Sequence, residues 1–314
     1  MKVFLAGATG VVGRRLVPLL VKAGHEEVGM TRSPEKTEFL RVMGAEPVVA
    51  DALDPDAVMK AVTEARPEVI IHQLTAIPVR VDLRRFDRDF ALTDRLRTKG
   101  TRHLLTAARE AGARRFVAQG FAGWCYAREG SRVKTEDDPF DTDPPVVFRR
   151  TLDAVRELET RVLGAKGLEG LVLRYGWFYG PGTQIGEGGS IVEAVRRRQM
   201  PVVGKGTGIW SFAHVDDAAG ATMAAVEGGR PGVYNVADDD PAPVAEWLPA
   251  LAEAVGARPP RRVPAWLARL LVGAAGVAIM TENRGISSAK AKGELGWEPR
   301  WPSWREGFRK GLGE

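Results

Sequence analysis

The sequence predicts an α/β fold, a doubly wound parallel sheet followed by a smaller C-terminal lobe. Two observations predict it: apolar runs of strand length alternate with helix-period segments, and those runs are almost continuously apolar. Strands of this kind belong to parallel sheets that helices cover on both faces. The runs are 2–6, 26–30, 46–50, 68–74, 115–119 and 170–175, and the helical patterns are 11–23, 34–44, 55–65, 84–111 and 146–166.

The regular alternation of apolar strands and helical segments ends after residue 176. The segment "GWFYGPGTQIGEGGS" (176–190) is rich in glycine and aromatic residues, which is typical of a loop that lines a pocket, and a helix (190–199) follows it. The run "GVYNVA" (232–237) is expected to return to the main sheet, and the tail from 243 is helical. We therefore predict a dinucleotide-binding domain and a substrate-binding lobe. The dinucleotide-binding domain comprises 1–176 plus 213–237, and the substrate-binding lobe comprises 177–212 plus 238–314. The cleft between them is expected to be lined by 120–130, 175–190 and 205–214.

Composition narrows the class of partner. The net charge is +5 and the pI about 9.4, but the basic residues are spread among acids. The one dense cluster, "RRR" at 196–198, is typical of a solvated helix end, so we expect no nucleic-acid partner. The single cysteine, Cys125, and four scattered histidines offer no metal-ligand spacing. We expect a small-molecule substrate and no metal, and we leave a homodimer open.

One stretch, "VPAWLARLLVGAAGVAIM" (263–280), is membrane-like. Arg269 and two glycines interrupt it, and it falls short of the roughly 20 apolar residues that a spanning helix needs. We expect a partly buried helix with a loop, either a lid or a dimer surface, and no membrane partner. The apolar run at 3–6 is too short for a signal core, so we expect a cytoplasmic location.

A glycine turn directly follows the first strand. Gly7, Gly10 and Gly13 are spaced G-x-x-G-x-x-G within "VFLAGATGVVGRRL" (3–16). In such turns the first glycine allows a sharp bend, the second lets a pyrophosphate approach the backbone, and the third brings the helix close to the sheet. The sequence therefore predicts a dinucleotide bound at this turn, with Thr9, Val11 and Val12 among its contacts.

The end of the second strand indicates which dinucleotide binds. An acid about 20 residues beyond the turn would bind the ribose 2′-hydroxyl and repel a 2′-phosphate. This chain has Thr31 and Arg32 there, with Lys36 one helical turn further on. A guanidinium binds phosphate through paired charged hydrogen bonds, so we favour NADP(H) over NAD(H), with Arg32 on the 2′-phosphate.

Four further residues complete the predicted cofactor contacts. Asp51 follows the third strand, where it could reach the adenine or cap the next helix, and both interpretations stay open. Ala52 is next to it, Leu74 is the last residue of the fourth strand, and Thr75 follows that strand.

These motifs together resemble the extended short-chain dehydrogenase/reductase family, which includes NAD(P)-dependent epimerases, dehydratases and ketone reductases. The resemblance extends from residue 1 to about 300 and is carried by "GATGVVG", "ADALD", "RYGWFYGPGT", "SFAHVDDAAGA", "GVYNVADD" and "AKGELGWEP". It implies a Rossmann fold, a dinucleotide across the strand ends and a substrate held by the second lobe.

The chain departs from this family where the family transfers protons. Members usually carry a Tyr-x-x-x-Lys pair on the helix before the sixth strand, and the tyrosine exchanges a proton with the substrate while hydride moves. Here that helix (144–163) contains neither residue type. Gln119 and Gly120 replace the usual Ser-Ser, and Arg97 replaces the asparagine before Gly-Thr.

Three functions are compatible with these observations. We favour an NADP(H)-dependent oxidoreductase that acts on a small apolar carbonyl or alkene and takes its proton from another group or from water. The alternatives are a binding protein that senses the NADPH/NADP ratio and, least favoured, a nucleotide-sugar epimerase or dehydratase, because those enzymes need the tyrosine.

Candidate site residues lie in the loops after the fifth and sixth strands. Tyr126 is the candidate proton donor because its loop borders the nicotinamide site in the family. His214 is interpreted as scaffold and Cys125 as a small buried residue. The aromatic residues expected to line an apolar substrate site are Trp124, Tyr175, Trp177, Phe178 and Trp210.

Overall fold

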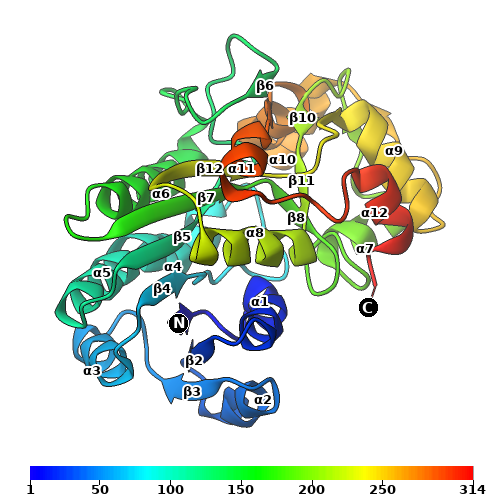
Figure 1. Cartoon of the computed structure of the whole chain (residues 1–314). Helices are drawn as coiled ribbons and strands as arrows, with labels where there is room; N and C mark the ends of the chain where they lie inside the picture. The colour runs from blue at the N-terminus through cyan, green and yellow to red at the C-terminus, as the bar shows by residue number, and fades with distance from the viewer. Residues whose placement is uncertain (314) are drawn as a thin grey trace.

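The computed structural model describes residues 1–313 and is built on a seven-stranded parallel sheet (Figure 1). The strand order is β12-β7-β5-β4-β1-β2-β3, so the order reverses between β1 and β4, where doubly wound sheets bind their ligands. The fold class predicted from the apolar runs is confirmed. The strands are β1 (Lys2–Ala6), β2 (Glu26–Thr31), β3 (Glu46–Val49), β4 (Val69–His72), β5 (Arg115–Phe121), β7 (Glu169–Tyr175) and β12 (Gly232–Val236).

Helices cover both faces of the sheet. Alternate strand residues separate two cores: Leu5 packs with Leu16 of α1 on one face, and Phe4 packs with Val62 of α3 on the other. Helices α1 and α8 cover the first face, and α3, α5 and α6 cover the second. Their bounds are α1 (Val11–Lys22), α2 (Thr37–Val42), α3 (Pro55–Ala65), α4 (Phe86–Arg95), α5 (Thr101–Glu110), α6 (Val146–Leu163) and α8 (Val215–Glu227).

Two of the predicted helices are not α-helical over their whole length. The predicted helix 84–111 is α4 and α5 joined by a π-helical turn at Leu96–Gly100, which shifts the hydrogen-bond register without breaking the rod. The predicted helix 34–44 begins as a 3₁₀ turn, Pro34–Lys36, before α2. Apolar periodicity cannot reveal either change because the same side chains stay buried.

The C-terminal lobe is built from short strand pairs and helices around an aromatic core. The chain leaves the sheet after β7 and returns to it through α8 and β12, which pairs with β7. The elements of the lobe are β6 (Val133–Lys134), β8 (Trp177–Tyr179), α7 (Ser190–Arg196), β9 (Val202–Val203), β10 (Ile209–Trp210), β11 (Phe212–His214), β13 (Ala242–Pro243), α9 (Val244–Ala254), β14 (Arg262–Val263), α10 (Ala265–Thr281), β15 (Gly285–Ile286), α11 (Ala289–Leu295) and α12 (Trp304–Lys310).

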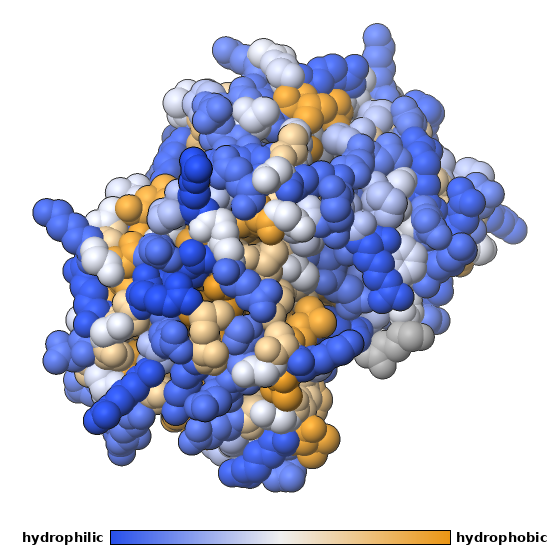
Figure 2. Space-filling model, in the orientation of Figure 1, coloured by the Kyte–Doolittle hydropathy of each residue, from blue (hydrophilic) through white to orange (hydrophobic). Residues whose placement is uncertain are grey.

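The membrane-like stretch forms α10, and the expected interruption is a kink at Gly273, whose φ is 72°. Trp266, Leu270 and Leu271 lie exposed before the kink. None of the helices within residues 1–313 is both long and apolar enough to cross a membrane. Hydrophilic residues cover most of the face shown in Figure 2, with hydrophobic residues in small groups between them.

Candidate cofactor and substrate site

The glycine turn lies between β1 and α1, at the point where the strand order reverses. Gly7 has a φ of 101°, and a Cβ there would lie 2.8 Å from the carbonyl oxygen of Gln73 beyond β4. A Cβ on Gly13 would overlap the carbonyl of Gly7. Side chains are therefore excluded at both positions, and the turn packs directly against the end of the neighbouring strand.

Helix α1 begins at Val11, within this turn, so its N-terminus lies at the turn. Gly10 is the N-cap and supplies no side-chain cap, and the first turn of the helix holds no acid. The N–H groups at a helix start carry a partial positive charge that suits a phosphate. Of the predicted contacts, Thr9 and Val11 are half-buried and Val12 is buried.

The end of β2 supplies the predicted phosphate-binding cations. Thr31 is buried, and its hydroxyl accepts a hydrogen bond from the Ser33 backbone N–H at 3.2 Å. Arg32 is exposed and Lys36 is half-buried in the 3₁₀ turn. Because β1 and β2 are neighbouring strands, this end lies at the same sheet edge as the glycine turn. Contact of Arg32 with a 2′-phosphate stays a prediction.

The loop after β3 corrects one alternative. The N-cap of α3 is Asp54, whose carboxylate accepts hydrogen bonds from Asp56 and Ala57, so Asp51 does not cap the helix. The Asp51 carboxylate instead accepts a hydrogen bond from the Leu53 N–H at 2.9 Å and is exposed to a ligand. The neighbouring Ala52 is buried.

A buried histidine fixes the loop after β4, and the sequence interpretation missed it. The His72 Nδ1 accepts a hydrogen bond from the Leu74 N–H at 3.2 Å, so Nε2 carries the proton and donates to the Leu96 carbonyl at 3.3 Å. Burial lowers the pKa of His72 to about 4 and keeps the ring neutral. Through its two hydrogen bonds, His72 connects Leu74 to the π-helical turn; Thr75, which follows Leu74, is exposed.

Most of the buried side chains of α6 are apolar. The helix contains neither tyrosine nor lysine, and Phe148 and Leu152, four residues apart, are buried on it. The Phe148 ring is stacked on Trp124 with centroids 4.3 Å apart. Phe86 of α4 meets the Phe148 ring edge-on at 4.7 Å. A tyrosine-lysine pair has no counterpart here, and the ring of Phe148 and the side chain of Leu152 place hydrocarbon on this part of the helix, beside Thr151.

The polar groups beside this aromatic cluster lie against one another. The Thr151 hydroxyl donates to Asp94 at 3.0 Å, and Arg97 lies 4.0 Å from the same carboxylate. Burial raises the pKa of Asp94 and lowers that of Arg97. Burial also raises the pKa of Cys125 to about 12, which confirms Cys125 as a buried thiol and excludes a ready nucleophile.

Tyr126, the candidate proton donor, is held inside the protein. Its hydroxyl donates to Asn235 Oδ1 at 2.8 Å and accepts from Arg174 at 2.7 Å, and Arg174 forms a bidentate ion pair with Glu159. Burial raises the pKa of Tyr126 to about 12. The hydroxyl proton is committed to Asn235, so the geometry favours a structural role over the predicted catalytic one.

The five aromatic residues predicted to line the substrate site divide into two groups. Trp124, Trp177 and Trp210 belong to the aromatic core of the lobe, and Trp177 is stacked on Trp210 at 4.0 Å. Tyr175 and Phe178 pack on the opposite side, against the α1–α8 core. Tyr175 is fully buried with its hydroxyl bonded to Thr222, which corrects its assignment as a lining residue.

Exposure separates the remaining aromatic side chains. Trp210 and Trp124 are buried, at 2% and 8% exposure, whereas Trp177 and Phe178 are half-buried. The half-buried Phe121 at the end of β5 meets Trp177 edge-on at 5.6 Å. Phe121 and Trp177 therefore form the accessible edge of the aromatic core, next to Gly123.

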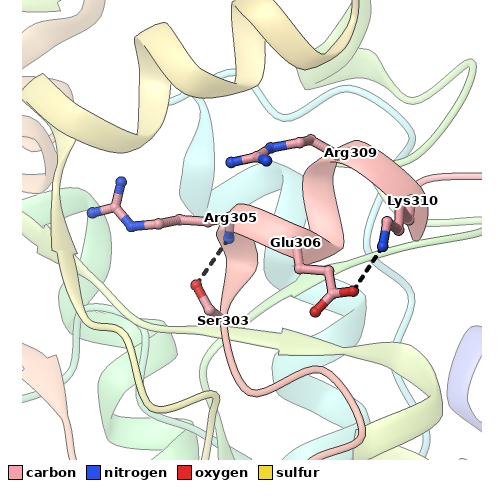
Figure 3. A pocket seen from close by; sticks show the side chains of 5 residues that line it. All are labelled: Ser303, Arg305, Glu306, Arg309 and Lys310. Carbon is pink, nitrogen blue, oxygen red and sulfur yellow. Dashed lines mark hydrogen bonds and ion pairs between the residues drawn. The ribbon is translucent and has the colours of Figure 1, made fainter.

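Two surface hollows lie outside the predicted cleft. One, of about 320 Å³, is lined by side chains of α12, where Glu306 pairs with Lys310 and Ser303 caps the helix (Figure 3). The other lies between α5 and α6 and is lined by residues that include Arg102 and Arg161. None of the residues that line either hollow belongs to 120–130, 175–190 or 205–214, so neither hollow is the cleft that the sequence predicts.

The glycine turn at the switch point, the doubly wound sheet and the lobe above it define a dinucleotide-binding enzyme of the extended short-chain dehydrogenase/reductase type. The family model for the NAD dependent epimerase/dehydratase family matches residues 3–237, and the chain belongs to this family. It is an NAD(P)-dependent oxidoreductase, as the resemblance implied.

Known proteins support this assignment. A 3-diazoavenalumate denitrifying reductase from Streptomyces sp is 47% identical over 98% of this chain and 99% of that protein. A 2-alkyl-3-oxoalkanoate reductase from Stenotrophomonas maltophilia is 27% identical over 82% of this chain and 76% of its own length. The UDP-glucose 4-epimerase of Thermotoga maritima shares the fold, with a TM-score of 0.78 at 22% identity over 99% of this chain and 97% of the epimerase.

Proposed function

We propose that the protein is an NADP(H)-dependent reductase that transfers hydride to an aromatic carbon bearing a diazonium group and replaces the nitrogen by hydrogen. The observation that carries the proposal is the contrast between two halves of the site. The glycine turn for the cofactor is intact, whereas α6 has Phe148 and Leu152 on its buried face and neither tyrosine nor lysine. The name of the 47% identical relative supplies the reaction class.

The proposed chemistry needs no proton donor. Reduction of a ketone requires a hydride and a proton, which is the step that a positioned acid assists. A diazonium carbon requires only the hydride: R–N₂⁺ + H⁻ → R–H + N₂. The hydride electron pair forms the new C–H bond, the C–N bond breaks with its pair leaving on dinitrogen, and NADPH becomes NADP⁺. A site without a tyrosine-lysine pair can therefore complete this reaction.

The accessible aromatic edge suits a flat, electron-poor substrate. The Trp177 ring is fixed by a hydrogen bond from Nε1 to the Gly123 carbonyl at 3.1 Å and by its stacking on Trp210. Aromatic faces attract cations as well as conjugated rings, which favours a diazonium group on an arene. Phe121, which meets Trp177 edge-on, adds a second half-buried ring.

The choice of NADP(H) is supported by the end of β2. Arg32 is exposed, and the position where NAD-binding proteins carry an acid is occupied by Thr31 and Arg32. An exposed guanidinium favours the 2′-phosphate, and a carboxylate that would repel it does not follow the strand.

Isotope labelling with a diazonium probe tests the proposal. The purified protein is incubated with 4-carboxybenzenediazonium and NADPH deuterated at either hydride position of C4, with a protein-free reaction as control. We expect benzoate carrying deuterium at the carbon that bore nitrogen, from one labelled face only, and one N₂ for each NADP⁺.

A different outcome would favour carbonyl reduction. If the protein consumes NADPH with apolar ketones or enones and leaves the diazonium probe at its protein-free rate, the proposed reaction is wrong. The carbonyl alternative is supported by the 2-alkyl-3-oxoalkanoate reductase relative and requires a proton from water.

A further inference from the structure

We propose that Arg14 is a second residue that recognises the 2′-phosphate of NADP(H), acting together with Arg32. The proposal rests on the NADP(H) preference proposed above. Arg14 directly follows Gly13, one turn into α1, so it is part of the element that opens on the glycine turn.

The Arg14 guanidinium is held in place from two sides. Its Nε donates a hydrogen bond to the Thr9 carbonyl at 3.0 Å. Its Cζ lies 5.2 Å from the ring centroid of Phe39 in α2, a cation–π contact. The side chain thus reaches from the glycine turn to α2, the helix that follows Arg32 and Lys36.

Within residues 1–313, no acidic side chain pairs with Arg14. It is exposed, and its contacts are a carbonyl and an aromatic ring, neither of which neutralises a cation. The next residue, Arg15, points elsewhere and pairs with Asp216 of α8 at 3.5 Å. The acid of α2, Glu38, pairs with Arg41 at 3.1 Å.

This arrangement suits a phosphate. Because Nε is already bonded to Thr9, the two terminal amino groups of Arg14 are left for a ligand. Register places Ala6 of β1 opposite Met30 of β2, so Arg14 and Arg32 flank the same sheet edge from adjacent elements. A guanidinium fixed before binding loses less freedom when it forms charged hydrogen bonds.

Binding of NADP⁺ and NAD⁺, which differ only in the 2′-phosphate, tests the inference without turnover. Calorimetric titration compares the parent with Arg14→Ala, Arg32→Ala and, as a matched control, Arg15→Ala. We expect Arg14→Ala to weaken NADP⁺ about tenfold and NAD⁺ less than twofold. Arg15→Ala changes neither affinity, and Phe39→Leu, which keeps the bulk but removes the ring, weakens NADP⁺ about threefold.

The outcomes separate this inference from the proposed cofactor preference. If Arg32→Ala weakens NADP⁺ and Arg14→Ala does not, Arg14 has no part in recognition while the preference stands. Equal weakening of both cofactors by Arg14→Ala, with unchanged circular dichroism, would instead mean that Arg14 supports the diphosphate turn and would overturn the inference. Equal affinity of the parent for both cofactors would contradict the preference itself.

Discussion

Phe148 and Trp124 are stacked with ring centroids 4.3 Å apart and planes inclined by 19°. Both rings are buried, and Phe148 stands on the helix where related enzymes carry their catalytic tyrosine. Apolar packing therefore connects the loop after β5 to α6, the helix on which family members usually carry the tyrosine that transfers a proton.

Removing the Phe148 ring should destabilise the protein. We expect Phe148→Ala to lower the free energy of unfolding by about 3–5 kcal/mol, because a large buried ring leaves a cavity. Val146→Ala on the same helix, at a position 68% exposed, is the control and should change it by less than about 0.5 kcal/mol. Urea titration measures both. A loss for Phe148→Ala as small as that of the control would mean that the stack contributes little.

Arg32 should determine the cofactor preference. The parent is expected to bind NADPH more tightly than NADH, and Arg32→Ala should remove most of the difference, because hydrogen bonds to a charged phosphate are each worth about 1.5–3 kcal/mol. Arg41→Ala, which removes a cation already paired with Glu38, is the control. An unchanged ratio of the two affinities in Arg32→Ala would argue against the assignment.

Tyr126 should behave as a structural residue. Tyr126→Phe leaves Asn235 and Arg174 without a shared partner, so we expect a loss of about 1–3 kcal/mol in the free energy of unfolding. The rate of NADPH-dependent reduction should fall less than about threefold, since a general acid would be worth about 10²–10⁴. A loss of hundredfold or more in a folded variant would restore Tyr126 as the proton donor.

Glu27 should make stability depend on pH. Its side chain is buried without a hydrogen-bond partner, and burial raises its pKa from 4.5 to about 8. The folded protein therefore retains a proton that the unfolded chain releases, and this stabilisation is present below pH 4.5 and lost as the pH rises through 8.

The neutral variant Glu27→Gln isolates this effect. We expect it to exceed the parent in free energy of unfolding by about 3–5 kcal/mol at pH 8 and to match it near pH 4. Denaturant titration across this range is the measurement. A difference between the two proteins that does not change with pH would show that Glu27 does not titrate on unfolding.

The sheet and the glycine turn could be predicted from the sequence because they depend on local patterns. Continuously apolar strands favour a parallel sheet that helices cover on both faces. At Gly7 and Gly13 a Cβ would overlap backbone atoms, so only glycine fits. Asp51 and Asp54 are three residues apart, and the sequence did not show that the helix begins after Asp54, which makes Asp54 its N-cap.

Contacts between distant segments could not be predicted. Tyr126 meets Asn235, 109 residues away, and only the fold shows that its hydroxyl is occupied. The cation–π contact between Arg14 and Phe39 has the same origin, although the arginine directly after the third glycine was a visible signal. Along β8 the side chains alternate, so Trp177 and Tyr179 pack in the aromatic core and Phe178 packs against the α1–α8 core, and the sequence did not show which face each side chain would take.

The central claim is that hydride is transferred without a proton from the protein. The most direct test is the solvent isotope effect on single-turnover reduction of 4-carboxybenzenediazonium by NADPH, measured in H₂O and D₂O. We expect a ratio of about 1 and protium at the reduced carbon, because no proton moves in the step. A ratio of about 2 or more, or deuterium from solvent at that carbon, would contradict the account.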